Sequence, residues 1–196
     1  MKHLIDKFKA NGFDAIFCKD IVEAREEILK RVKGKSVGIG DSHTIIDMEI
    51  LEEIKKVACG VFTSLEDKSI QARRKETAQE IYITSVNAVS ENSAEMVNID
   101  SKCNRIAGST FGPEQVIYVF GKNKIEPNLE KALLRARNVA AVQNSRLKDY
   151  DIPCRKVGKC LDCNSPDRIC RVTAIYHKCP KGLRGIIILI DENLGF

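Results

Sequence analysis

The chain has 196 residues, 43% of them hydrophobic and 30% charged, a size that can bury a sizeable core and that predicts a single domain over residues 1–196. The longest apolar run, 186–190, is far shorter than the roughly 20 residues of a membrane span, and residues 1–10 lack the pattern of a secretory signal, so we expect a cytoplasmic protein without a transmembrane helix. Residues 121–196 carry the basic excess that gives the chain its net charge of +5, and a basic region can bind nucleic acid. The chain has no tryptophan and no recognisable nucleic-acid motif, which argues against nucleic acid as a partner.

Short apolar runs alternate with amphipathic stretches along the first half of the chain. Asp20 and Glu23 have the spacing of a helix capping box, and Thr44 with Asp47 forms a looser, acidic version of it. In chain order, the pattern predicts helix 2–11, strand 13–18, a helix between Asp20 and Gly34, strand 36–39, helix 44–57, strand 61–63, helix 67–79 and strand 81–85.

The second half continues the same alternation. Residues 88–100 are predicted to form a hairpin, 116–120 a buried strand and 185–190 a final core strand, while 151–170 is predicted to be a loop. A helix beginning at Pro127 would place on one face the residues Leu129, Ala132, Leu133, Ala136 and Ala140. Helices between apolar strands favour a three-layer α/β fold with a mostly parallel central sheet, flanking helices, a hairpin and a C-terminal cysteine-rich loop.

Four of the eight cysteines lie in the segment PCRKVGKCLDCNSPDRIC with the spacing C-x5-C-x2-C-x6-C: they are Cys154, Cys160, Cys163 and Cys170. A loop punctuated by proline and glycine can fold four soft thiolates onto one centre, which suits either a tetrahedral zinc ion or a [4Fe–4S] cluster. Because the spacing lacks the two separated C-x2-C pairs typical of zinc sites, we favour the [4Fe–4S] cluster, with zinc as the alternative. Free thiols, disulfides and a catalytic dithiol stay open as other interpretations, and the remaining cysteines are expected to be ordinary thiols.

The turn GIGDSHT (38–44) follows a predicted strand and opens a predicted helix, where main-chain N–H groups attract anions such as carboxylate or phosphate. Residues 84–87 end another strand, and ligands of open parallel sheets collect beyond the carboxyl ends of the strands. We therefore expect an anion pocket at this sheet edge, lined by Gly40, Asp41, Ser42, His43, Thr44, Ser85 and Asn87.

A plain strand–helix turn is the other interpretation of residues 38–44, and the Asp41 carboxylate would oppose an anion there by charge repulsion. Asn104 and Arg105, with residues 108–112, are expected to close the pocket from the side of the hairpin. His43 is a candidate general acid or base, and an exposed turn histidine is the interpretation that the pattern favours over it. The sequence shows no Ser-His-Asp arrangement, so it predicts no reaction.

These motifs together resemble the LUD-domain family, the lactate-utilisation proteins. The resemblance covers nearly the whole chain and rests on GIGDSHT (38–44), TSVNAVSENSAEMVNID (84–100), NRIAGSTFGPEQVIYVFGKNKI (104–125), the helix from Pro127 through Ala141, PCRKVGKCLDCNSPDRIC (153–170) and GIIILIDENLGF (185–196). The family usually has Gly-Gly-Ser in the first turn, where this chain has Asp41 as the second residue. The resemblance implies a fold similar to CoA-transferases and ribose-5-phosphate isomerases. The transferases use a glutamate nucleophile, for which Glu95 is the nearest candidate here, but the pattern favours a solvated hairpin glutamate at this position.

Three functions follow from the resemblance as hypotheses. The first is a redox-accessory subunit that carries a [4Fe–4S] cluster and acts with an iron–sulfur partner protein in lactate oxidation, since the chain has no flavin or nicotinamide fingerprint of its own. The second is an enzyme that acts on a small phosphorylated or CoA-linked anion at the sheet edge. The third is a zinc-stapled binding or regulatory module. The sequence does not predict an oligomeric state.

Overall fold

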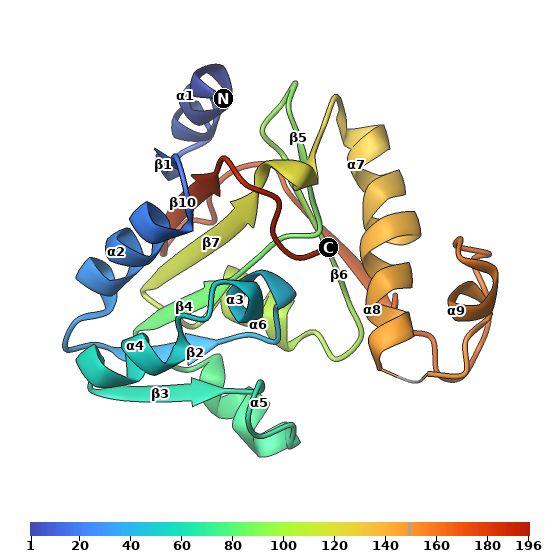
Figure 1. The fold of residues 1–196 in the computed structure, drawn as a ribbon, viewed down its shortest axis with the longest axis horizontal. Coiled ribbons are helices and arrows are strands. Elements are labelled where there is room, and N and C mark those ends of the chain that lie inside the picture. The colour runs from blue at the N-terminus through green and yellow to red at the C-terminus, as the bar shows by residue number, and fades with distance from the viewer. Residues whose placement is uncertain (149) are drawn as a thin grey trace.

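The computed structural model describes residues 1–148 and 150–196, and its centre is a six-stranded parallel sheet with the order β1-β10-β7-β4-β2-β3 (Figure 1). The strands of this sheet are β1 (Asp14–Cys18), β2 (Ser36–Ile39), β3 (Gly60–Thr63), β4 (Ile81–Thr84), β7 (Gln115–Gly121) and β10 (Arg184–Ile190). The α/β fold with a mostly parallel central sheet and flanking helices, which the sequence predicts, is thereby confirmed.

Successive side chains of the central strands point alternately to the two faces of the sheet, and both faces are buried. In β10, Ile186 and Ile188 pack on one face, and Ile187 and Leu189 pack on the other, because successive side chains of a strand point in opposite directions. Both faces of the sheet are covered, so the middle strands are continuous apolar runs rather than alternating apolar and polar residues.

Three helices cover the first face: α2 (Ile21–Val32), α3 (His43–Asp47) and α4 (Leu51–Val57). The predicted cap of α2 is present, since the Asp20 carboxylate accepts the backbone N–H of Glu23 at 2.8 Å. The Glu23 carboxylate returns to the backbone N–H of Lys19, also at 2.8 Å, rather than to that of Asp20. Two reciprocal hydrogen bonds therefore cap the start of this helix. They differ from a standard capping box in that the returning carboxylate reaches the residue before the N-cap.

The prediction of one helix over 44–57 is wrong, because the chain breaks between α3 and α4 at Glu49, whose φ is 49°. Met48 and Ile50 are both buried in the same core. An unbroken helix would point residues two apart in different directions, so the break allows both to be buried. The predicted Thr44–Asp47 cap is also absent, since the Asp47 carboxylate accepts the backbone N–H of Gly195 at 2.7 Å.

A second, four-stranded sheet lies against the other face of the central sheet, in the order β8-β5-β6-β9. Its strands β5 (Ala88–Ser90) and β6 (Met96–Asp100) form the predicted antiparallel hairpin. Strand β8 (Ile125–Glu126) extends this sheet on one side and β9 (Val172–Tyr176) on the other, and the sequence predicted neither. Helix α1 (Lys2–Ala10) covers another part of this face.

A long helical run covers the outer side of the second sheet (Figure 1). Ala132 and Ala136 of this run pack against the hairpin, as the predicted apolar face requires. The run begins one residue after Asn128, whose side chain accepts the backbone N–H of Lys131 at 2.9 Å. The run consists of α7 (Leu129–Arg135), a π-helical segment (Ala136–Ala140) and α8 (Ala141–Leu147).

The remaining α-helices are short, and each of them differs from the sequence prediction. The predicted helix 67–79 is limited to α5 (Ile70–Glu76), which begins where Ser69 caps the backbone N–H of Ala72. The segment 151–170, which was predicted to be a loop, contains helix α9 (Pro153–Val157), which packs beside α8. Helix α6 (Asn104–Thr110) was not predicted from the sequence. Within residues 1–148 and 150–196, none of the helices has the length and apolarity to cross a bilayer.

Gly38 in β2 provides a test of the packing between β2 and α5. A Cβ atom at Gly38 would overlap the backbone carbonyl of Glu76, whereas a Cβ atom at Gly60 in the neighbouring strand β3 would come no closer than 3.4 Å to another residue. Overpacking a core typically costs about 1–3 kcal/mol. We expect Gly38→Ala to lower the free energy of unfolding by about 3 kcal/mol and Gly60→Ala by less than about 1 kcal/mol, measured by urea denaturation. Equal losses in the two variants would contradict this packing.

Candidate functional site

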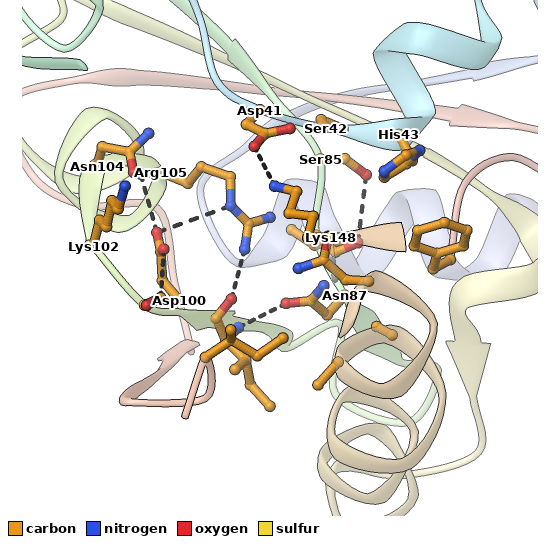
Figure 2. Close-up of a pocket in the computed structure, with 18 of the residues that line it drawn as sticks. Asp41, Ser42, His43, Ser85, Asn87, Asp100, Lys102, Asn104, Arg105 and Lys148 are labelled. Atoms are coloured by element: carbon orange, nitrogen blue, oxygen red, sulfur yellow. Dashed lines mark hydrogen bonds and ion pairs between the residues drawn. The ribbon is translucent and has the colours of Figure 1, made fainter. Parts of the chain in front are cut away.

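The carboxyl ends of β2, β4 and β7 meet at one edge of the central sheet. Ile39 pairs with Ile83, and Thr84 pairs with Tyr118, so the segments that follow these three strands start side by side. They surround a cavity of about 120 Å³, which helices α5, α6 and α8 help to close (Figure 2). This is the edge at which open parallel sheets collect their ligands.

The structure brings most of the predicted pocket residues together at this cavity. Those that line it are Asp41, Ser42, His43, Ser85 and Asn87, and Asn104 and Arg105 close it from the side of the hairpin. Gly40 and Thr44 are not part of the lining. A Cβ atom at Gly40 would overlap the Tyr82 hydroxyl and lie 3.1 Å from Cγ of Arg105, so glycine allows the close approach of this turn.

Lys124 is the most buried cation of the lining, with 3% of its surface exposed, and the sequence analysis missed it. Its Nζ donates to Thr44 Oγ1 at 2.8 Å, to Ser85 Oγ at 3.0 Å and to the backbone carbonyl of Val86 at 3.1 Å. Burial, with the nearby charges of Arg135 and Arg105, lowers the pKa of Lys124 to about 7. Thr44 therefore acts beneath the cavity, as a partner of Lys124.

Helix α5 places two charged residues in the interior, three positions apart on one helix face. The carboxylate of Glu76 accepts the backbone N–H of Ser64 at 2.6 Å and the side-chain N–H of Asn104 at 2.7 Å. Arg73 lines the cavity with only 7% of its surface exposed, and its Nε has no hydrogen-bond partner within the described part of the chain. Buried polar groups are normally paired, so this N–H is a donor that a bound molecule would satisfy.

Asp41 forms an ion pair with Lys148 of the turn that follows α8, and Figure 2 shows the two side chains meeting at the cavity. Burial raises the pKa of Asp41, but the hydrogen bond from Lys148 and the charge of Lys148 lower it by a larger amount. The pKa therefore lies below its usual value, and the carboxylate is ionised. Lys148 thereby offsets the repulsion of an anion that the sequence analysis expected from Asp41.

Positive charge exceeds negative charge around the cavity. The backbone N–H of Arg105 donates to the Asp100 carboxylate at 3.1 Å, and its guanidinium donates to the carbonyl of Ile99 at 2.5 Å, which fixes the guanidinium in the wall (Figure 2). The lining contains two carboxylates, Asp41 and Asp100, against five basic side chains, Arg73, Lys102, Arg105, Lys124 and Lys148. An excess of cations in a partly enclosed site favours an anionic ligand.

Comparison with known proteins identifies the family to which this chain belongs. The sequence model of the LUD domain matches residues 1–190, which include every strand of both sheets. The chain belongs to the LUD domain family. This confirms the resemblance seen in the sequence, and the family is associated with lactate utilisation.

A solved structure from Deinococcus radiodurans, described as a DUF162 family protein, is similar to this LUD domain in fold. The two chains superpose with a TM-score of 0.56 and are 12% identical, and the match covers 96% of this chain and 94% of that one. At this identity the likeness concerns the fold alone. Among curated proteins, none matches the sequence.

The LUD domain holds His43 and Glu95 in different surroundings. The imidazole of His43 lies in the cavity wall against the ring of Phe196, with the ring centroids 4.4 Å apart. Burial lowers the pKa of His43, so the ring is neutral at pH 7. Glu95 is not in the lining and pairs instead with Ser93 and His177, so the cavity does not use it as a nucleophile.

The four cysteines of the predicted metal site are half-buried free thiols in the segment around and after α9. Cys154 lies beside Ser145 of α8, and Cys160 Sγ accepts the backbone N–H of Asp162 at 3.4 Å. In the portion of the chain that is described, no three His, Cys, Asp or Glu side chains are placed to hold a metal ion together. In this arrangement the four thiols are not gathered around one point, so the metal centre stays a prediction from the cysteine spacing.

Glu76 provides a test of the buried network beside the cavity. Burial raises the pKa of Glu76 above its ordinary 4.5, so the folded state keeps this proton to higher pH than the unfolded state does. The contribution of Glu76 to stability is therefore lost as the pH rises from 4.5 through the folded pKa. Glu76→Gln cannot titrate, and its free energy of unfolding should fall less than that of the wild type between about pH 4 and pH 8.

Denaturation with urea at a series of pH values measures this difference. Glu80→Gln is the matched control, because the hydrogen bond from Lys35 lowers the pKa of Glu80 and places its titration below 4.5. Its curve should stay parallel to that of the wild type above this pH. Parallel curves for Glu76→Gln as well would show that Glu76 does not titrate in a buried site.

Proposed function

We propose that this LUD domain binds a small organic carboxylate in the cavity at the carboxyl edge of its central sheet. The observation that supports the proposal most directly is Arg73, a nine-tenths buried guanidinium whose Nε lacks a partner in the described residues and which lines a cavity with an excess of cations. Guanidinium groups bind carboxylates through paired, charge-assisted hydrogen bonds. The association of the family with lactate utilisation makes a short hydroxy or oxo acid the natural ligand class.

The arrangement can hold both ends of such a ligand. Arg73 and Arg105 offer charged N–H groups to the carboxylate, and Lys124, Ser85 and Asn87 offer polar groups to an oxygen on the next carbon. A cavity of about 120 Å³ admits a few heavy atoms, which suits a short acid better than an entire CoA molecule. His43 is a neutral imidazole in the same wall and can take up or release a proton, so an enzymatic role on the same ligand class is part of this proposal.

Replacing Arg73 tests the proposed binding site. A hydrogen bond to a charged group contributes roughly 1.5–3 kcal/mol, so Arg73→Gln should weaken the binding of lactate or pyruvate by about 10- to 100-fold. Arg74→Gln on the same helix is the matched control, because Arg74 is exposed and outside the lining. Titration calorimetry at fixed ionic strength measures both variants. Equal affinities for the two variants, or no binding of either acid by the wild type, would refute the proposal.

A second proposal concerns the cysteine segment, which supports the role of a redox-accessory subunit in lactate oxidation. We infer from the C-x5-C-x2-C-x6-C spacing that Cys154, Cys160, Cys163 and Cys170 bind a [4Fe–4S] cluster, with zinc in a binding or regulatory module as the alternative. The segment also reaches the cavity, since Ile169, next to Cys170, lines its wall. An iron–sulfur protein is the proposed partner. The basic residues of 121–196 offer a surface to which a partner protein with an acidic surface can bind.

Metal analysis of protein prepared without oxygen tests this second proposal. The wild type should contain iron with acid-labile sulfide, Cys163→Ser should lose most of it, and Cys59→Ser should retain it, because Cys59 is an exposed free thiol outside the segment. Zinc in place of iron would favour the regulatory module. Metal-free wild-type protein, or equal metal contents in the two variants, would overturn the metal site.

A further inference from the structure

Lys124 is held by three oxygen atoms, none of which belongs to a carboxylate. Two are the hydroxyl oxygens of Thr44 and Ser85, and the third is the backbone carbonyl of Val86. Within the described residues, no carboxylate lies within ion-pair distance of its Nζ. A hydroxyl can either accept or donate, so the pair of hydroxyls can hold the amine as an ammonium ion or as the free base.

The surroundings of this amine make the free base accessible near neutral pH. Burial removes the water that would solvate an ammonium ion, and the guanidinium groups of Arg105 and Arg135 add like-charge repulsion, so the pKa of Lys124 falls to about 7. Desolvation beside other cations is one of the ways in which proteins turn a lysine into a nucleophile. A lysine needed only to join three segments would gain nothing from this environment.

We propose that Lys124 forms an imine with a small 2-oxo carboxylate bound in the cavity, an inference that rests on the proposed function and extends it to covalent chemistry. Arg73 and Lys124 line the same small space, so a ligand whose carboxylate lies on the guanidinium brings the adjacent carbon toward the amine. In a 2-oxo acid that carbon is a carbonyl carbon. A 2-hydroxy acid has no electrophilic carbon at this position and binds without reacting.

The step balances within the cavity and needs no oxidant or reductant. The nitrogen lone pair of Lys124 attacks the carbonyl carbon and forms a C–N bond. The carbonyl oxygen receives two protons, both of which the amine nitrogen gives up, and leaves as water, so that a C=N bond remains. The hydroxyls of Thr44 and Ser85 contact Nζ, and the neutral imidazole of His43 lines the same wall, so these groups can relay the protons.

Reductive trapping tests the inference on the intact protein. Pyruvate with cyanoborohydride should convert the imine into a stable amine, and peptide mass mapping should place one reduced pyruvyl group on Lys124. Lys102 is the internal control, because it is an exposed amine that lines the same cavity. Lys124→Arg keeps a cation but has no primary amine, so the adduct should be lost in this variant, whose fold is checked by its thermal unfolding.

The outcomes separate this inference from the proposed function. An adduct on Lys124 that is several-fold more abundant than on Lys102, and that lactate suppresses by competition, would support it. If calorimetry shows that pyruvate binds but no adduct forms on Lys124, or if adducts spread evenly over the lysines, the imine is refuted and the binding site stands. If pyruvate does not bind, both proposals fail. The mapping of the wild type decides between these outcomes even if Lys124→Arg does not fold.

Discussion

The hydrogen bonds of Lys124 join three segments that follow three different strands, and the geometry of the cavity depends on them. Thr44 follows β2, Ser85 and Val86 follow β4, and Lys124 itself follows β7. Parallel pairing brings the ends of these strands to one edge, but pairing alone does not fix the loops beyond it. A single buried amine with an oxygen partner from each neighbouring segment does so, and Lys124 itself is part of the cavity lining.

The charged groups around this amine differ in how they are paired. Asp41 and Lys148 neutralise each other, and Arg105 is fixed by Asp100 and Ile99. Glu76 is satisfied by N–H donors from two directions. Arg73 stands apart in this part of the described structure, because its Nε is buried without a partner. Unpaired buried donors are destabilising, and this is the reason for assigning the proposed carboxylate ligand to Arg73.

The sequence predicts the parts of this architecture that depend on local pattern. The apolar runs in β7 and β10 identify the core strands, and the rule that ligands lie beyond the carboxyl ends of parallel strands places Ser42, His43, Ser85 and Asn87 near one another. Both features follow from side-chain type and chain order. The short strands β8 and β9 were missed because their pairing depends on a hairpin distant in sequence, which no local pattern reveals.

The residues that define the chemistry of the cavity were harder to predict. Lys124 lies in a Lys-Asn-Lys stretch that is typical of an exposed turn, and Arg73 lies in a helix with many charges. Their burial comes from tertiary packing, which local propensity does not encode. The break at Glu49 has the same origin, since it serves the burial of Met48 and Ile50 in a core built from distant strands. Two lysines, Lys122 and Lys124, follow the buried strand β7 within three residues, but no feature of the sequence separates the buried Lys124 from the exposed Lys122.

Amide NMR of the uniformly labelled protein during a titration with pyruvate is the most direct test of whether a small carboxylate binds at the sheet edge. Binding there should produce saturable shifts confined to the backbone amides of residues 41–44, 85–87 and 122–124 and of the ends of α5 and α6 that face the cavity. Shifts that are spread over exposed lysines and arginines, or that do not saturate, would contradict it.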